Sequence, residues 1–434
     1  MKKQQRIIFI IAAIVAGIAI LAALFVVSLR VANRDIESSD FSDLMPVLVE
    51  QIPPEENALT YFEMARDAFI VPSEMDYNRY DSLGVYLHEN QTNVVVIAKF
   101  IVENTEALEL LQQGAQRERC VFPVPENFDE PGFDYENWKN LGALLFYKIQ
   151  YGQEKGDIDT ALQDARVMLR FSWLTRQNAF GLVHLLIGLR VEEKAFSAIQ
   201  ELTRNPRLSK IQLEFLFDLV NDTPPCDDTF LNAIKMEFRF QNMLITEPEK
   251  LFNFSYKKPP FWVNFLSQHT FRPNQTKLEH ANFFRKQIAD ILKFYSDVER
   301  LDISFWLKRP VLSELFYGNY IGKIFLNMML IDLTFVIEKR CEMDAQLTAT
   351  KIILACHLFQ RATERAPETL DELVPDYLPS VPLDPFDGKP FRYNLNEGTV
   401  YSVGTALEDF GGVVVASDDD SPRKKANIVF KVWE

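Results

Sequence analysis

The stretch from Ala366 to Gly404 reads APETLDELVPDYLPSVPLDPFDGKPFRYNLNEGTVYSVG and decides the fold of the C-terminal part of the chain. Between residues 378 and 390, the four prolines at 379, 382, 385 and 390 exclude a helix and favour an extended backbone. Asp387-Gly388 predicts a turn. Segments 391–393, 399–403 and 428–432 are rich in β-branched and aromatic residues, so each predicts a strand.

A predicted helix from Cys341 to Thr363 leads directly into this stretch. A sheet this small needs a helix to cover its apolar face. We therefore expect the leucines of the helix to be buried against apolar residues that follow it, and Phe386 to point inward. The expected contacts join Leu347, Leu354 and Leu358 to Leu373, Tyr377, Phe391 and Tyr401.

The same stretch resembles the C-terminal module of type II secretion major pseudopilins, which other bacterial envelope proteins also carry. The resemblance implies a small α+β module with an antiparallel sheet over residues 341–434, and no activity. The matching residues are Pro367, Leu370, Glu372-Leu373-Val374, Tyr377-Leu378-Pro379, Val381-Pro382, Asp384 through Pro390, Tyr393 and Tyr401-Ser402-Val403-Gly404.

The whole chain is also similar to a group of uncharacterised bacterial single-pass envelope proteins, through short motifs. The matches are Glu56-Asn57-Ala58 with Tyr61, Ala107-Leu108 with Leu110-Leu111, Cys120, Asp157 with Ala161-Leu162, and Glu237 with Arg239. This resemblance implies a membrane-anchored protein with no assigned activity.

The other decisive feature is the run from Ile7 to Leu29, which contains no charged residue. As a helix it is about 34 Å long, enough to cross a hydrocarbon core of about 30 Å. Basic residues precede it and a mixture of basic and acidic residues follows it, which favours a cytoplasmic N-terminus. A cleaved signal peptide is the alternative, but the run is long and ends without a small-residue site. We expect a single-pass inner-membrane protein that faces the periplasm.

The composition of the chain excludes several classes of ligand. A net charge of −15 argues against nucleic-acid binding. The four cysteines form no C-x-x-C pair, and the five histidines are scattered, so neither a zinc nor a redox motif is present. The expected partners are the lipid bilayer, through residues 7–29, and an envelope protein.

Residues 55–340 are expected to be almost wholly helical, because apolar residues recur there at helical spacing. No fixed repeat is present, so the pattern predicts a helical bundle or an irregular solenoid. The chain therefore divides into residues 1–34 (stub and anchor), 35–340 (helical ectodomain) and 341–434 (the α+β module). Residues 320–337 are also apolar, but Lys323, Asn327 and Asp332 favour a buried core helix over a second span.

Three local predictions concern the helical ectodomain. A helix capped by Thr92 or Asn93 is expected to run to about Gln116, whereas residues 72–92 show no clear period and predict a loop. The aromatic segment 247–276 also has no period. Phe261-Trp262 within it is a candidate wedge of a lid or membrane-facing loop, and a loop whose aromatics cap the helical core is the alternative.

Calcium is the one ligand that the resemblance suggests, because major pseudopilins bind it in the loop after the "Y-S-x-G" strand. Here the acidic candidates in that loop are Glu408, Asp409 and Asp418, and hard oxygen ligands suit calcium. Asn427 stands where the family has an aspartate, and residues 413–425 look inserted. A solvated acidic loop is the alternative.

The motifs for catalysis are weak. Glu237 and Arg239, with Asn57, are candidates for an interior polar site, with structural ion pairs as the alternative. No phosphate-binding glycine loop or nucleophile motif is present. We therefore expect a binding or scaffolding protein, linked to envelope or secretion assemblies. The alternative is an envelope hydrolase or carbohydrate-active protein with a helical core, which a pocket of converging carboxylates would favour.

Overall fold

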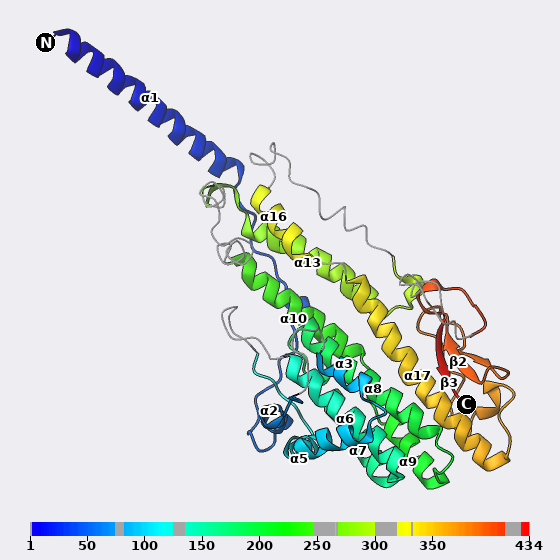
Figure 1. Cartoon of the computed structure of the whole chain (residues 1–434). Coiled ribbons are helices and arrows are strands. Elements are labelled where there is room, and N and C mark those ends of the chain that lie inside the picture. Colours follow the sequence, from blue (N-terminus) through cyan, green and yellow to red (C-terminus); the bar gives the residue numbers. More distant parts are fainter. Residues whose placement is uncertain are drawn as a thin grey trace.

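The computed structural model describes residues 2–73, 82–124, 135–246, 265, 268–299, 319–330, 333–412 and 427–433. Helix α1 (Lys2–Ala32) projects away from a helical body, and the small sheet lies at the opposite end (Figure 1). Ile7–Ala32 is long and apolar enough to span a membrane, and 0% of its most apolar stretch is buried. This agrees with a membrane anchor, while the orientation of the anchor stays a prediction.

The body contains twelve further described helices and four short 3₁₀ turns, which follow one another along the chain. The helices are α2 (Ala58–Ala68), α3 (Ser82–Glu89), α4 (Val94–Glu103), α5 (Thr105–Ala115), α6 (Tyr135–Lys155), α7 (Ile158–Gln177), α8 (Leu182–Thr203), α9 (Lys210–Asn221), α10 (Asp227–Thr246), α13 (Pro273–Asp290), α16 (Tyr320–Met329) and α17 (Thr334–Thr363). The turns are η1 (Ser42–Leu44), η2 (Tyr295–Asp297), η3 (Leu370–Leu373) and η4 (Gly404–Ala406).

Side chains at the helix starts fix several of these boundaries. The Asn57 side chain accepts a hydrogen bond from the amide of Leu59, and Asp157 accepts one from the amide of Thr160, so α2 and α7 each begin at a capped residue. Ser209 begins α9 with a reciprocal capping box to Gln212. Each cap satisfies backbone donors that the first helical turn leaves unpaired.

The centre of the body is built from α6, α7 and α8, which all pack against one another. Aromatic rings fill the space beside them. The Trp138 ring stacks on Phe171 with centroids 5.6 Å apart, and Phe62 from α2 meets Trp138 edge-on at 5.8 Å. The mainly helical body was predicted from the sequence, whereas its description as an irregular solenoid stays a prediction.

Two local predictions were wrong. The predicted continuous helix over residues 93–116 is broken at Asn104, whose buried side chain both accepts from the amide of Ile70 at 2.7 Å and donates to its carbonyl at 3.0 Å. The predicted loop over residues 72–92 contains α3, whose buried residues Leu83 and Leu87 lie one turn apart. An eight-residue helix is too short to show a clear period in the sequence.

The sheet is antiparallel, in the order β1 (Arg392–Asn394), β2 (Thr399–Ser402) and β3 (Ile428–Lys431). Arg392 lies opposite Tyr401, and Tyr401 lies opposite Val429. The three strands are those predicted from residues 391–393, 399–403 and 428–432. The chain wraps from η3 to β1 without a helix, as the prolines require.

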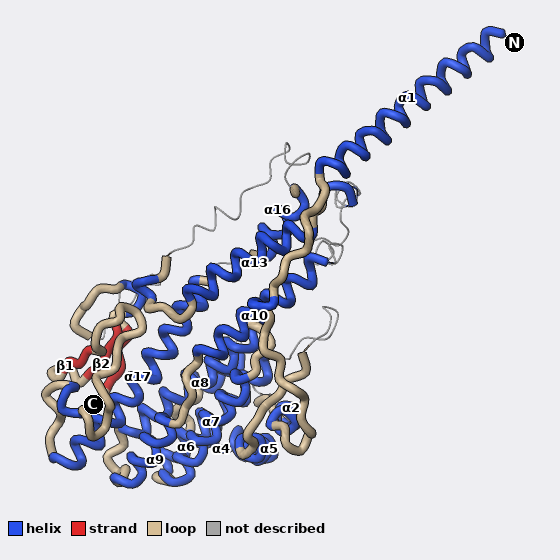
Figure 2. Tube along the Cα trace, turned by 180° about the vertical axis from the view of Figure 1, so that it is seen from behind, coloured by secondary structure: helices blue, strands red, loops and turns tan. Residues whose placement is uncertain are grey.

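Helix α17 lies between the sheet and the rest of the body, because one side of it contacts β2 and other parts contact α8 and α9 (Figure 2). Leu354 and Leu358 are buried in the same core as Leu373 and Phe391, and Phe386 is fully buried. The predicted burial of these side chains is confirmed, while Leu347 and Tyr377 are only partly buried. The domain boundary predicted between residues 340 and 341 falls within α17, and it stays a prediction.

The apolar region after residue 319 forms α16 and the start of α17, and 56% of its most apolar stretch is buried in the body. That burial fits a core element better than a second span. Most of the aromatic segment 247–276, including the proposed wedge Phe261-Trp262, lies outside the described residues. All four cysteines are buried and unpaired.

Candidate functional site

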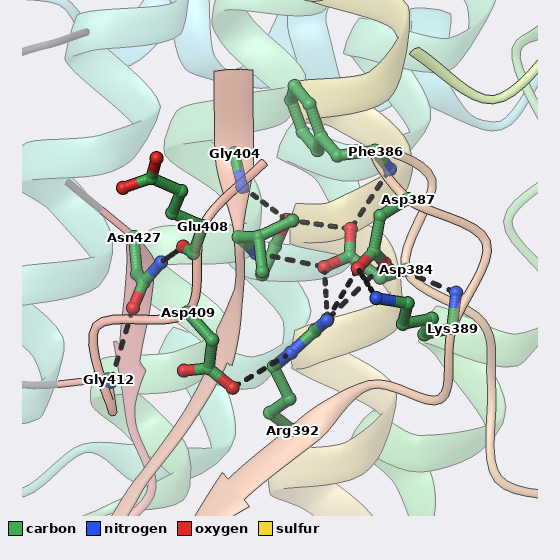
Figure 3. A network of polar contacts seen from close by, with 12 residues as sticks. Asp384, Phe386, Asp387, Lys389, Arg392, Gly404, Glu408, Asp409, Gly412 and Asn427 are labelled. Carbon is green, nitrogen blue, oxygen red and sulfur yellow. Dashed lines mark hydrogen bonds and ion pairs between the residues drawn. The ribbon is translucent and has the colours of Figure 1, made fainter. Parts of the chain in front are cut away.

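The strongest polar feature of the C-terminal module is the carboxylate of Asp384, which is 0% exposed. Its Oδ1 accepts hydrogen bonds from the hydroxyl of Ser402 at 2.7 Å and from the amide of Phe386 at 3.0 Å. Its Oδ2 accepts from the amide of Val403 at 2.9 Å and from Arg392 at 2.9 Å. Figure 3 shows Phe386 and Arg392 directed towards Asp384. The bonds from Ser402 and Val403 tie the proline-rich wrap to the end of β2.

Arg392 joins this carboxylate to two others. It donates to Asp387 Oδ2 at 2.6 Å, and its Nε lies 3.3 Å from Asp409 Oδ2 (Figure 3). Burial alone lowers the pKa of Arg392, but the hydrogen bond to Asp387 and the charges of the three aspartates outweigh burial and raise it. Arg392 thus offsets part of the negative charge of three aspartates, and Lys389 adds a second positive charge 3.8 Å from Asp387.

The two calcium candidates that the structure describes, Glu408 and Asp409, lie differently relative to this cluster. Asp409 is bound to Arg392 and also accepts from the amide of Gly411 at 2.8 Å. The Glu408 carboxylate points away from Arg392 in Figure 3. Asp418 lies outside the described residues. Within the described ranges, no group of three or more His, Cys, Asp or Glu side chains is placed to hold a metal ion.

Asn427 holds the same loop with a set of hydrogen bonds that an aspartate could not make in full. Its Oδ1 accepts from the amides of Phe410 at 2.9 Å and Gly412 at 3.3 Å, while its Nδ2 donates to the carbonyl of Glu408 at 2.8 Å. An amide side chain both accepts and donates, whereas an ionised carboxylate only accepts. Asn427 and Arg392 therefore hold the described part of this loop without a cation, and the calcium site stays a prediction, since Asp418 lies outside the described residues.

A groove of about 550 Å³ lies beside this module, where β3 meets α8 and α17. Ile428 and Phe430 of β3 form its apolar wall, and Asn427 and Thr405 line the end next to the Asp384–Arg392 network. The facing helices contribute the remaining lining side chains, which are Arg190, Glu193, Glu338, Lys339, Glu342 and Gln346.

Glu193 organises the helical wall of the groove. Its carboxylate accepts from Arg190 at 2.9 Å and from Lys339 at 3.3 Å, and Lys339 also reaches Glu342 at 3.2 Å. Burial alone raises the pKa of Glu193, but Lys339 and Arg190 together lower it. Glu193 is consequently a carboxylate at neutral pH, which suits the recognition of cations and backbone donors rather than proton transfer.

The carboxyls with raised pKa lie elsewhere and are paired. Burial raises the pKa of Asp164, which binds Lys148 at 2.7 Å, and raises that of Asp344 to about 6 beside Arg340 at 2.7 Å. Neither residue is among those that line the groove. A paired interior carboxyl is more typical of a structural network than of a general acid.

Asn57 and Glu237, two of the three candidates for an interior polar site, each have hydrogen-bond partners outside that set. Asn57 links α2 to the backbone of Val121, with bonds of 2.8 and 3.0 Å. Glu237 instead accepts from Gln241 on its own helix at 3.0 Å. The sequence did not reveal a different buried pair, formed by Arg176 and Glu192.

Arg176 and Glu192 are each 1% exposed and form two hydrogen bonds, at 2.8 and 3.0 Å. Arg176 also donates to the carbonyl of Pro224 at 2.7 Å, which joins α7 and α8 to the start of α10. A side chain at Gly188 would meet Arg176 at 2.8 Å, so a glycine is needed there. Nothing in a single sequence distinguishes this pair from surface charges on α7 and α8.

A second cavity, of about 440 Å³, lies between α5, α7 and α9. Arg170 lines it, with its guanidinium 4.6 Å from the Trp173 ring centroid and with hydrogen bonds to the carbonyls of Ala115 and Arg117. Those carbonyls end α5, so Arg170 acts first as a helix C-terminal partner.

Comparison of the chain with protein-family models, curated proteins and solved structures found no match.

Proposed function

We propose that this chain is a single-pass envelope protein that presents a binding surface at a fixed orientation to the inner membrane, with its ectodomain in the periplasm. The proposal rests on α1 for anchoring and on the polar groove beside β3 for binding. The pseudopilin-like module serves in this proposal as the element that forms one wall of the groove.

The observation that carries the proposal is the junction between the anchor and the body. The carboxylate of Asp35 accepts from the amides of Asn274 at 2.7 Å and Gln275 at 3.1 Å, in the first turn of α13. Arg272 donates back to the carbonyl of Ala32, the last residue of α1. A carboxylate at a helix N-terminus satisfies unpaired donors and the helix dipole together.

A second contact fastens the same segment further along α13. Arg285 binds both carboxylate oxygens of Asp43 at 2.8 Å, a bidentate geometry. Because the segment after α1 is held at two points, the body cannot swing freely as it would on a flexible linker. A fixed orientation is useful to a protein that docks a partner at a defined height above the membrane.

The orientation is tested by cysteine labelling of the full-length protein in spheroplasts. The native cysteines are all buried, which gives a low background. We expect Asn396→Cys, in the exposed turn between β1 and β2, to react with a membrane-impermeant maleimide in intact spheroplasts. Gln4→Cys is expected to react only after lysis, and the reverse pattern would contradict the proposal.

The binding role is tested with a photo-cross-linking amino acid at Glu342, in the groove, and at Glu214 on α9 as the matched control. The two glutamate side chains are 41% and 50% exposed, so both are accessible. We expect a discrete protein adduct from position 342 in growing cells and none from position 214. Equal adducts from both positions, or none from either, would count against a docking groove.

A further inference from the structure

β3 is an edge strand, since the described sheet ends with it. The unpaired backbone groups of an edge strand are a template for another extended chain, unless the protein covers them. Among the residues that the structure describes, the edge borders the groove of about 550 Å³ rather than a packed helix. The edge and the groove together therefore form one surface.

The register shows which groups of β3 are available. Val432 donates to the carbonyl of Gly398 at 2.8 Å, one step beyond the pair Lys431 and Thr399. Hydrogen-bonded and non-bonded pairs alternate along an antiparallel ladder. Phe430 and Ile428 are therefore the residues bonded to β2, and the backbone groups of Val429 and Lys431 point to the free edge.

One end of that edge already has a partner. Arg204, just after α8, donates to the carbonyl of Lys431 at 3.4 Å. The amide and carbonyl of Val429 and the amide of Lys431 have no hydrogen bond to any residue that the structure describes. Two donors and one acceptor in a row match the spacing that an added strand requires.

The side chains beside this edge indicate what such a strand carries. Ile428 and Phe430 share one face of β3 and line the groove, opposite Glu342 and Glu338 on α17. The groove is lined by three glutamates against one arginine and one lysine. A lysine in an added strand would lay its apolar stem on Phe430 and reach the glutamates with its ammonium group.

We infer that the free edge of β3 binds an extended segment of a protein partner, as an added strand with basic side chains at alternate positions facing the groove. This inference rests on the proposed docking function and specifies the chemistry of its partner. Backbone hydrogen bonds supply affinity, and the alternate side chains supply specificity.

The first test uses the full-length wild-type protein in detergent and an acetylated, amidated peptide of four Lys-Val repeats. Two variants of the peptide are N-methylated, one on every lysine and the other on every valine. Alternate residues of a strand point their backbone amides to the same edge, so each variant blocks the amides of one edge. We expect one of the two N-methylated peptides to bind at least about tenfold more weakly and the other to bind nearly as well as the parent. A Glu-Val repeat peptide is the charge control and should bind more weakly than the Lys-Val peptide.

The second test changes the protein. Val429→Pro removes one outward amide without touching the ladder to β2, and proline is tolerated where an edge amide faces away from the sheet. We expect about tenfold weaker binding of the Lys-Val peptide, whereas Val429→Thr, which keeps the amide, should bind like wild type. If the proline variant does not fold, the two N-methylated peptides on the wild-type protein decide the question.

The outcomes separate the two proposals. Equal binding of both N-methylated peptides, equal binding of the Glu-Val peptide, or no binding of the Lys-Val peptide would each overturn strand addition. A cross-linked adduct at position 342 that persists in Val429→Pro would retain the docking function and reject the edge of β3 as its site. Loss of that adduct in Val429→Pro, but not in Val429→Thr, supports both.

Discussion

Asp384 and Arg392 form an ion pair of 2.9 Å in which the carboxylate is 0% exposed and the guanidinium side chain is 15% exposed. The carboxylate accepts three further hydrogen bonds, from Phe386, Ser402 and Val403. Every partner of Asp384 is thus a donor. The pair joins the proline-rich wrap to both β1 and the end of β2, so the local fold depends on a residue with no exposed surface.

Replacing Asp384 by Asn should destabilise the protein by about 3–5 kcal/mol. Whichever way the asparagine side chain is turned, its NH₂ group replaces an oxygen that accepts hydrogen bonds and so faces other donors. The measurement is the urea midpoint of the full-length protein in detergent. Asp371→Asn, at an exposed aspartate on η3, is the control and should change the midpoint little. Similar midpoints for the two variants would show that the network is dispensable.

Calcium is expected to leave the thermal midpoint of the wild-type protein unchanged, because Asp409 is already paired with Arg392. Arg392→Met should lower the midpoint and make it calcium-dependent, since it leaves Asp384, Asp387 and Asp409 without their shared cation. Melting curves with calcium and with EDTA check both statements. A wild-type midpoint that rises with calcium would favour a true calcium site that includes Glu408 or Asp418.

His280 should make the body sensitive to acid. Burial lowers its pKa to about 3 from an ordinary value of 6.5, while Nε2 lies 2.9 Å from Gln241 Oε1. Because the folded-state pKa lies below the unfolded one, its contribution is fully present above pH 6.5 and is lost as the pH falls towards 3. The loss amounts to about 1.4 kcal/mol per pH unit within that window.

We expect His280→Phe to lose less stability than wild type between pH 6.5 and pH 4, in unfolding curves taken at several pH values. His88, which is exposed on α3, is the matched control, and His88→Phe should follow the wild-type pH profile. Parallel profiles for wild type and His280→Phe would mean that His280 is not the group that binds the proton.

Leu354→Ala should cost about 2–5 kcal/mol, since Leu354 on α17 is 0% exposed within the main core. Leu395, which is 43% exposed after β1, provides the control, and Leu395→Ala should cost far less. Urea midpoints of the full-length variants give the comparison. Equal midpoints would place Leu354 outside the cooperative core.

The domain boundary between residues 340 and 341 can be tested separately with fragment 341–434. One side of α17 packs on α8 and α9, so the fragment would expose that apolar side to solvent. We expect it to aggregate or to unfold at lower urea than the full chain. A fragment as stable as the full protein would instead establish an independent C-terminal domain.

The sequence determined those features that depend on short-range chemistry. The uncharged run from Ile7 to Leu29 predicts a membrane-spanning helix, because the length and apolar character of the segment are enough for that prediction. Pro379 to Pro390 exclude a helix, and the strand segments that follow were placed within one or two residues. The capping residues Asn57, Asp157 and Ser209 act on their own first turns, so they too are local.

Only the tertiary structure decided how charges are paired and which edges are free. Asp35 caps a helix that begins more than 230 positions later, and Arg392 binds two aspartates of one turn together with Asp409 from a later loop. Asn104 breaks a helix through a backbone segment 34 residues away. The sequence shows which residues are polar, whereas packing between distant segments decides which partner each polar group binds.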